Sequence, residues 1–486
     1  MLNISKKRIK LEYIIAASIV IILSVILLRR PIIGVADNGD FARIMNSTGL
    51  YYLTDDPDEI YFGYVNRLYG TGYIIPFGGG YFSTQILLVL LAVFISGSFY
   101  DKAIFDIRHL AAIYIAIIAI SAYYAVKGIR RRSFLSAVLT AILLIFIFCD
   151  TAYTSYFNSL YGEPVTLVFL LLMSAMAVAM STEDRPSIQS LVLFGAGALF
   201  FAGAKIQNVP AGILAVLLFA RVAALRKDKA WRAISVVSAL VILFISLVGY
   251  ISISGDIRIC NKYQTVFFGI LKGSSDPAGD LKELGLDPSY EALAGTNYFM
   301  DDYAVDIRAP EFKKMISESV SHLKVAAFYA KHPGRLMEKL ETAAENGFKL
   351  NQGFGNYEKH KDTHYKQVSE VFNVWSGFKM KALPHTLLFV AAFFGVILLV
   401  LLYEYIKADN RHNRLLIEYF GFIALLGIIQ FILPVIGDGE ADLSKHLFLF
   451  NVCFDIFIVA APVYAAAKIA ALVRYASKKR LPASLR

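Results

Sequence analysis

The sequence predicts an all-α polytopic membrane protein with about 10 transmembrane helices, and its composition is the first reason. Of the 486 residues, 57% are hydrophobic and only 18% are charged, whereas soluble proteins carry roughly 25% charged residues. The hydrophobic residues also occur in long blocks of the length that crosses a bilayer. The three cysteines lie far apart and match no metal or disulfide spacing. A soluble enzyme, a disordered chain and a disulfide scaffold are therefore excluded.

Ten hydrophobic blocks have a length close to the about 20 residues that a spanning helix needs. They are residues 11–28, 110–126, 134–148, 165–180, 191–204, 211–225, 233–253, 387–403, 415–436 and 447–472. The first block follows a basic segment that includes residues 6–8, and no small-residue cleavage site comes after it. We therefore expect a retained signal anchor and not a cleaved signal peptide.

An eleventh hydrophobic stretch, residues 83–97, is predicted to lie along the membrane interface. Counting it as a span would place the basic cluster at residues 127–132 outside the cell. Without it, that cluster, residues 226–232 and the basic C-terminal residues 478–480 all face the cytoplasm, as the positive-inside rule requires. We expect ten spans, both termini in the cytoplasm and a location in the plasma membrane.

This topology divides the chain into three parts and leaves two long segments on the extracytoplasmic side. The parts are an N-terminal module of seven helices with a long first outer loop (1–253, loop 31–109), a mainly helical outer domain (254–383) and a C-terminal module of three helices (384–486). The outer domain has 17 basic and 17 acidic residues, so the net charge of +10 belongs to the membrane part. That charge indicates helix orientation and contact with anionic lipid, not binding to nucleic acid.

The first outer loop contains a pair of carboxylates that could carry chemistry. Asp37 and Asp40 lie on either side of an Asn-Gly pair, which favours a turn on which both can converge. Near the lipid surface such a pair suits general-base catalysis or metal binding. An Asx turn or a helix cap explains the same residues equally well.

The loop after the third span offers acids and amides among aromatic residues, a composition that sugar rings favour. The candidates there are Asp150, Asn158, Tyr161 and Glu163. The alternative for the two carboxylates is that they only terminate helices at the interface. Both interpretations remain open from the sequence.

The positive-inside rule does not predict basic residues on the outer side, so each of them calls for an explanation. Lys205 lies between the fifth and sixth spans, and Lys445 and His446 directly precede the last span. Phosphate binding is one reason and snorkelling to the lipid headgroups is the other; His446 could also shuttle a proton. Asp455 lies about two turns into the last span, where a functional role and a helix–helix hydrogen bond are both open.

Taken together, these segments resemble the GT-C superfamily of integral membrane glycosyltransferases. The resemblance rests on residues 37–40, on residues 81–85 at the start of the interfacial helix, on residues 105–108 before the second span and on residues 442–451. The Lys-Pro-Pro that the aminoarabinose transferases of this superfamily carry is absent after Tyr81. The resemblance does not cover the outer domain.

The resemblance implies transfer of a sugar from a polyprenyl-phosphate donor to a glycan or lipid-linked acceptor outside the cytoplasm, with inversion. Asp40 or Asp37 would be the general base, with Asp40 preferred. The phosphate would be bound by Arg108, Lys205, Lys445 and His446. The sugar would be bound by Asp150, Asn158, Tyr161 and Glu163. Some relatives hold a divalent cation, Mg²⁺ or Mn²⁺, with loop acids; here those would be Asp37, Asp40, Asp150 and Glu163, and the sequence leaves the need for it open.

Two other functions are compatible with the sequence. A flippase or transporter of a lipid-linked glycan would need a polar track across the bilayer, and the spans offer only Asp455. A non-enzymatic scaffold or sensor would use the outer domain as its working part. Covalent product formation from a lipid-linked sugar separates the enzyme from both.

Overall fold

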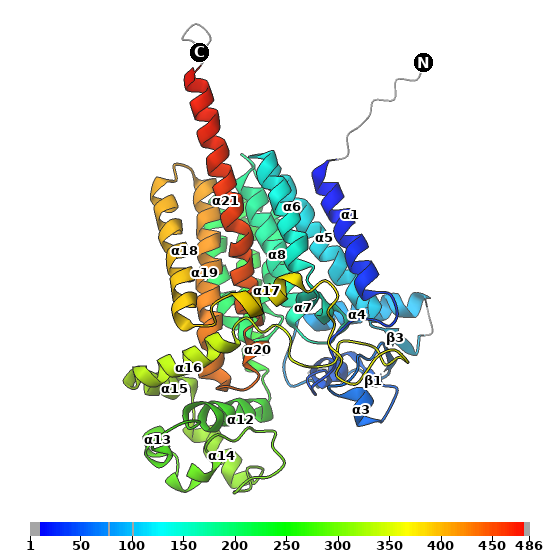
Figure 1. Ribbon diagram of the computed structural model, residues 1–486, viewed down its shortest axis with the longest axis vertical. Coiled ribbons are helices and arrows are strands. Elements are labelled where there is room, and N and C mark those ends of the chain that lie inside the picture. The colour runs from blue at the N-terminus through cyan, green and yellow to red at the C-terminus, as the bar shows by residue number, and fades with distance from the viewer. Residues whose placement is uncertain (1–9, 76–77, 100–101, 481–486) are drawn as a thin grey trace.

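The computed structural model describes residues 10–75, 78–99 and 102–480, and its main body is a bundle of long helices (Figure 1). Among these residues, seven helices are long and apolar enough to cross a membrane. They are α5 (Arg108–Arg130), α8 (Glu163–Ser181), α10 (Val209–Ala223) with the preceding turn η2 (Ile206–Asn208), α11 (Lys229–Ile251), α18 (Leu387–Lys407), α19 (Arg411–Asp438) and α21 (Phe448–Arg480). The protein is an α-helical multi-pass membrane protein, as the composition predicts.

The number of spans depends on how three shorter helices are counted. α6 (Phe134–Phe148) bends by 59° into the short helices α7 (Thr151–Thr154) and η1 (Ser155–Asn158), and as one span the pair gives an eighth crossing. α1 (Leu11–Leu27) and α9 (Ile188–Ala202) have 17 and 15 residues, which is short for a core of roughly 30 Å. α1 packs along α5, and α9 packs along α8. The ten spans stay a prediction, because they require both of these helices to cross.

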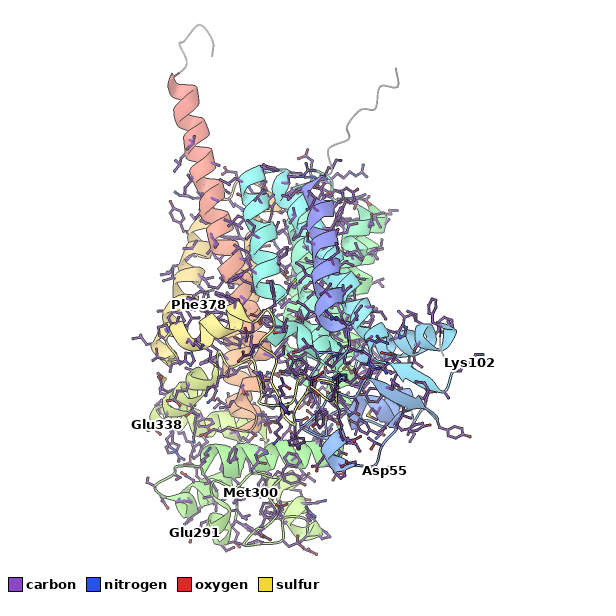
Figure 2. The ribbon with its side chains drawn as sticks, turned by 45° about the vertical axis from the view of Figure 1, so that its right-hand side comes forward. Asp55, Lys102, Glu291, Met300, Glu338 and Phe378 are labelled. Carbon is purple, nitrogen blue, oxygen red and sulfur yellow. The ribbon has the colours of Figure 1, made fainter. Side chains whose placement is uncertain are left out.

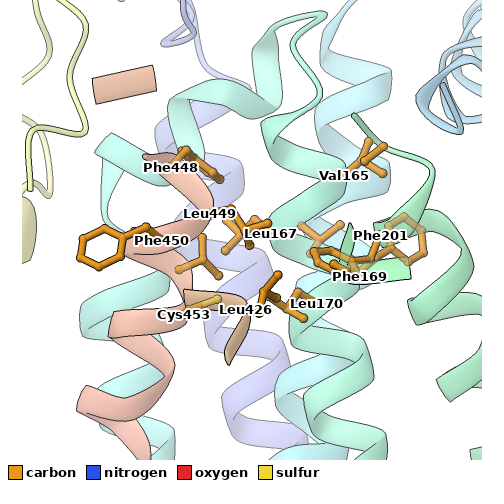
Figure 3. Packing of buried hydrophobic residues seen from close by; sticks show 14 of the residues in the cluster. Val165, Leu167, Phe169, Leu170, Phe201, Leu426, Phe448, Leu449, Phe450 and Cys453 are labelled. Atoms are coloured by element: carbon orange, nitrogen blue, oxygen red, sulfur yellow. The ribbon is translucent and has the colours of Figure 1, made fainter. Parts of the chain in front are cut away.

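α8 is the central helix of the bundle and positions the start of the site. It is apolar on all sides and almost wholly buried, as expected for a helix surrounded by others. Its neighbours are α5, α9, α19 and α21. Figure 3 shows Leu167 and Leu170 of α8 facing Leu426 of α19 and Leu449 and Cys453 of α21. The first residue of α8 is therefore held in place by packing on every side.

The loop between α1 and α5 folds into a small unit, which we call the first-loop unit. It holds the predicted interfacial helix, α4 (Gln85–Phe99), which lies across the bundle axes in Figure 1. Leu87, Leu91 and Phe94 form an exposed apolar face on α4, suited to the bilayer interface. The unit's other elements are α2 (Ala42–Thr48), α3 (Pro57–Ile60) and the strands β1 (Leu50–Tyr52), β2 (Leu68–Thr71) and β3 (Ile104–Asp106).

The three strands form a small antiparallel sheet in the order β1-β2-β3, which the sequence analysis did not predict and which leaves the architecture helical. Leu50 pairs with Thr71, and Leu68 pairs with Asp106. Strands of three or four residues are too short to show the alternation by which a strand is recognised in a sequence. This is why the sequence did not reveal the sheet.

The chain between α11 and α18 is mainly helical. Its helices are α12 (Gly255–Tyr263), η3 (Gln264–Ile270), α13 (Pro277–Leu284), η4 (Pro288–Leu293), α14 (Pro310–Ser319), α15 (His322–Lys331), α16 (Pro333–Asn346) and α17 (Val374–Ala382). α15 ends one residue before His332 and α16 begins at Pro333, because proline disfavours a helical residue ahead of it. The irregular segment 347–373, which we call the strap, runs back over the first-loop unit: the amide of Gly34 donates to the carbonyl of Asn356 at 2.8 Å.

Both large loop segments lie at one end of the bundle, which we call the loop end (Figure 1). α1 begins and α21 ends at the opposite end, as an even number of crossings requires. The basic residues 6–8 that orient α1 in the sequence lie outside the described residues. α20 (Leu443–His446), between α19 and α21, completes the loop end.

Candidate functional site

The turn at residues 37–41 is built around the carboxylate of Asp37. Its Oδ1 accepts hydrogen bonds from the amides of Gly39 at 2.8 Å and Phe41 at 3.0 Å, and its Oδ2 accepts from the Tyr52 hydroxyl at 2.6 Å. Gly39 has a φ of 101°, which glycine adopts without strain. Burial raises the pKa of Asp37 above its ordinary value. Asp37 thus forms the Asx turn of the alternative interpretation, and its oxygens are occupied by the protein's own donors.

Asp40, by contrast, presents its carboxylate to two cations. Oδ1 lies 2.9 Å from the guanidinium of Arg43, one turn later on α2, and Oδ2 accepts from the ammonium of Lys445 on α20. The Asp40 side chain is 24% exposed. Burial raises the pKa of Asp40, but the charges of Lys445 and Arg43 outweigh it and hold the pKa well below its ordinary value. Asp40 is therefore an ionised carboxylate at the surface of a charged cluster.

A second ion pair lies beside the first. Glu163 begins α8, and its Oε1 accepts from Lys205 Nζ at 2.5 Å. Gly162 permits this approach, since a Cβ there would lie 2.6 Å from Lys205 Cγ. Burial lowers the pKa of Lys445, but the nearby carboxylates Asp40 and Glu163 outweigh burial and raise it. The two ion pairs therefore act on each other electrostatically.

Tyr161 connects the two pairs. Its hydroxyl donates to the carbonyl of Ala36 at 3.0 Å and accepts from the amide of Asn38 at 3.0 Å. Lys445 Nζ lies 4.6 Å from the centroid of the Tyr161 ring, a cation–π geometry. Tyr161 thus fixes the Asp37–Asp40 turn against the start of α8 and orients Lys445.

We call Asp40, Arg43, Glu163, Lys205 and Lys445 the Asp40 cluster. Its members come from the first-loop unit, the start of α8, the chain between α9 and η2, and α20. Three cations face two carboxylates, so the cluster has one positive charge in excess. Partly buried cations with fixed geometry attract an anion with oxygen acceptors, such as a phosphate. Arg43 was missed in the sequence, although its position three residues after Asp40 ahead of a helix was a usable signal.

Other predicted site residues hold the fold together outside the cluster. Asp150 is fully buried; it caps α7 and accepts from the amide and the hydroxyl of Ser376 on α17, both at 2.8 Å. Asn158 donates to the carbonyls of Leu27 at 2.8 Å and Ile33 at 2.7 Å. Asp150 therefore has the helix-capping contact that the alternative interpretation describes, and Asn158 connects α1 to the first loop.

His446 and Arg108 also contact acids outside the cluster. His446 Nε2 lies 2.9 Å from Asp438 Oδ2 at the end of α19. Arg108 binds Asp106, with 2.7 Å between Nη2 and Oδ2, and Arg67, directly before β2, binds the same carboxylate at 2.7 Å. Arg108 thus belongs to a different ion-pair network from Lys205 and Lys445.

Asp455 has a partner that the sequence did not reveal. Its Oδ2 lies 2.7 Å from Lys379 Nζ on α17, and both side chains are fully buried. Lys379 Nζ also donates to Asn451 Oδ1 at 2.9 Å, and the Tyr153 hydroxyl donates to Asp455 at 2.5 Å. A carboxylate inside a span signals that it needs a partner, but no local pattern indicates that Lys379 supplies it.

The carboxylates do not form a metal site. Within the described ranges, no group of three or more His, Cys, Asp or Glu residues is arranged to hold a metal ion. Asp37 is saturated by its own turn, Asp150 is bound to Ser376, and Asp40 and Glu163 each face a lysine. This donor set does not fit Mg²⁺ or Mn²⁺, and we derive no step through a metal.

Two hollows lie away from the cluster. One of about 290 Å³ opens where the first-loop unit meets the strap, with Tyr64, Arg67, Glu358 and Lys359 in its wall. The other, of about 140 Å³, is lined by Arg221 and by α19 from Arg411 onward. The second lies at the end of the bundle opposite the loop end.

Comparison with known proteins assigns the family. The family model described as YfdI N-terminal transmembrane domain matches residues 2–482. The chain belongs to this family. A solved structure of the archaeal oligosaccharyltransferase AglB from Archaeoglobus fulgidus, in complex with an inhibitory peptide and a dolichol-phosphate, is similar to this YfdI-family chain with a TM-score of 0.36 and 12% sequence identity. The match covers 94% of this chain and 52% of that structure, so the chain spans about half its length. No curated protein matches the sequence.

Proposed function

We propose that the protein is a GT-C type membrane glycosyltransferase that transfers a sugar from a polyprenyl-phosphate donor to an extracytoplasmic acceptor. The observation that carries this proposal is the Asp40 cluster. A partly exposed carboxylate lies there beside three cations, at the end of the bundle where the phosphate of a bilayer lipid can reach it. A base next to an anion site is what sugar transfer from a lipid phosphate needs.

The basic residues at the other end of the bundle support an extracytoplasmic location for the loop end. Basic residues at the opposite end of the bundle include Arg131 and Arg132 after α5, Arg226 before α11 and Arg411 at the start of α19. The positive-inside rule places such residues in the cytoplasm. The exposed apolar face of α4 would then hold the first-loop unit at the outer bilayer surface.

The proposed reaction is a single displacement at the anomeric carbon. The acceptor oxygen forms a bond to that carbon while the bond between the carbon and the phosphate oxygen breaks. The hydroxyl proton passes to Asp40, and the electron pair of the broken bond leaves with the phosphate. Arg43, Lys205 and Lys445 stabilise the charge that develops on the phosphate. Attack opposite the leaving group inverts the configuration of the anomeric carbon.

Asp40 is preferred over Asp37 as the base for a geometric reason. The oxygens of Asp37 already accept three hydrogen bonds and the side chain is 2% exposed. Among the described residues, Asp40 has its two cations as ion-pair partners, and it reaches the surface. An acceptor hydroxyl can approach Asp40 without breaking the turn.

The ion pairs also suggest how the base is activated. Lys445 and Arg43 lower the pKa of Asp40, so that it is a weak base while both cations are paired with it. A donor phosphate competes for the same two cations. Once they turn to the phosphate, burial of Asp40 is no longer offset and its pKa rises. Donor binding therefore strengthens the base only when there is a sugar to transfer.

The test is a transfer assay with the purified full-length protein and radiolabelled polyprenyl-phosphate sugars. We expect Asp40→Asn to lower kcat by at least about 10²-fold. Asp55→Asn is the matched control, because Asp55 is an exposed acid of the same unit (Figure 2). A covalent glycan product separates transfer from flipping, and full activity of Asp40→Asn would remove Asp40 as the base.

A further inference from the structure

The cavity between the first-loop unit and the strap has the size and position of a ligand site. Its volume of about 290 Å³ is just below the range of about 300–1,000 Å³ for small-molecule pockets, which is enough for a single sugar unit and not for a larger ligand. Segments 53–54 and 64–68 form one side, and Glu358 and Lys359 of the strap form the other. The cavity reaches the surface, since the Lys359 side chain is 57% exposed and Glu59 33%.

The charges in its wall are paired with each other. Lys359 Nζ lies 2.5 Å from Glu59 Oε1, and Arg67 Nε lies 3.0 Å from Glu358 Oε1. Two cations and two carboxylates leave no net charge, in contrast to the excess positive charge of the Asp40 cluster. Such a wall does not select an ion. It offers both donors and acceptors to a neutral ligand with many hydroxyl groups.

Tyr64 adds an aromatic surface to this polar wall. Its ring packs edge-on against Tyr365 of the strap with 5.8 Å between centroids, and Lys359 Nζ lies 5.8 Å from its centroid. Gly63 makes room for Tyr365, because a Cβ there would lie 2.0 Å from that ring. An aromatic ring beside paired charges gives a ligand one apolar contact and several polar ones.

The cavity is built on the same backbone as the proposed base. Leu53 in its wall follows Tyr52, whose hydroxyl binds Asp37. The amide of Phe62, two residues before Tyr64, donates to the Asp37 carbonyl at 2.7 Å. A ligand in the cavity is therefore held by the unit that carries the Asp37–Asp40 turn.

We infer that this cavity binds a sugar unit of a neutral acceptor glycan, with the Tyr64 ring as the stacking surface and the Lys359–Glu59 and Arg67–Glu358 pairs as hydroxyl-binding groups. That the bound glycan is the acceptor rests on the proposed function. That the cavity binds a neutral glycan rests on the cavity alone. Donor and acceptor are then separated by charge. The anionic lipid phosphate goes to the Asp40 cluster, and the neutral glycan goes to the cavity.

The test uses full-length protein in nanodiscs of neutral lipid. The probes are a panel of neutral hexose, 6-deoxyhexose and N-acetylhexosamine oligosaccharides, with hexuronate oligosaccharides for contrast. We expect saturable binding of at least one neutral probe and weaker binding of the hexuronates. Tyr64→Ala should weaken binding of that probe about tenfold, whereas Tyr64→Phe should retain it. Tyr73→Ala is the matched control, since Tyr73 is 97% exposed on the same unit and is not in the cavity wall.

Two outcomes overturn the inference. One is the lack of saturable binding by any neutral probe, and the other is a Tyr64→Ala protein that binds as well as Tyr73→Ala. Asp40→Asn distinguishes the two proposals, because it should abolish transfer and leave glycan binding unchanged. Binding that is lost in Tyr64→Ala, together with full transfer by Asp40→Asn, would support the cavity and refute Asp40 as the base. In the transfer assay, Tyr64→Ala should raise the KM for the acceptor about tenfold without lowering kcat.

Discussion

Replacing Lys379 by Met should destabilise the protein by about 3–5 kcal/mol, because it leaves a buried carboxylate without its cation. Lys379 and Asp455 are both fully buried, with 2.7 Å between Nζ and Oδ2. Asn451 Oδ1 lies 2.9 Å from the same ammonium. After the substitution, the Tyr153 hydroxyl at 2.5 Å is the remaining donor to Asp455 among the described residues. A single neutral hydrogen bond does not compensate for the missing charge in a water-free bundle.

The assay is unfolding of the purified protein in detergent, followed by tryptophan fluorescence, with Lys381→Met as the matched control. Lys381 lies on the same helix and is exposed, so its substitution should change the free energy of unfolding by less than about 0.5 kcal/mol. The double variant Lys379→Met/Asp455→Leu removes both charges and should be more stable than Lys379→Met alone. The reasoning is refuted if Lys379→Met is as stable as Lys381→Met. It is also refuted if the stability loss of the double variant equals the sum of the losses in Lys379→Met and Asp455→Leu measured separately.

Two further predictions concern the first-loop unit and its contact with the strap. Gly34→Ala should lower the free energy of unfolding by about 1–3 kcal/mol, because its Cβ would lie 2.5 Å from the backbone oxygen of Asn158. Gly255→Ala is the control and should leave stability unchanged, because a Cβ there would have nothing within 4 Å. Thermal unfolding of both variants checks this. Burial raises the pKa of Glu358, but its bonds from Arg30 and Arg67 outweigh burial and hold the pKa below the ordinary 4.5. The stability from these bonds is therefore present above pH 4.5 and lost as the pH falls further. Between about pH 5 and pH 3 the unsubstituted protein should lose more stability than Glu358→Gln. Equal losses of the two proteins in a pH series of unfolding curves would contradict a lowered pKa of Glu358.

Local patterns in the sequence predicted the helices well, because a membrane span is recognised from length and composition alone. The prediction that α4 lies along the membrane interface rests on the placement of basic residues around it. The sheet of the first-loop unit was missed, since its strands are short and pair with partners supplied by the fold. The strap was also missed: Glu358 N–H donates to the Ile32 carbonyl at 3.1 Å across more than 300 residues, and no local feature indicates that contact.

The residue types of the candidate site were visible in the sequence, but their partners were not. The sequence alone does not distinguish Asp37 from Asp40, because both are aspartates next to the same Asn-Gly pair. In the structure one is saturated by its own turn and the other faces cations. Asp150 and Glu163 were likewise indistinguishable, and only packing shows that the first is bound to Ser376 and the second to Lys205.

The sequence by itself determined that this chain is a helical membrane protein with polar groups concentrated in its loops, because the bilayer imposes a local requirement on every spanning segment. Only the tertiary structure decided which lysine meets which carboxylate. Lys445 and Asp40 are 405 residues apart, and Lys379 and Asp455 are 76 apart. Such pairs form when packed helices bring together residues that are distant in the sequence, and the energy that selects them arises only after the bundle has assembled.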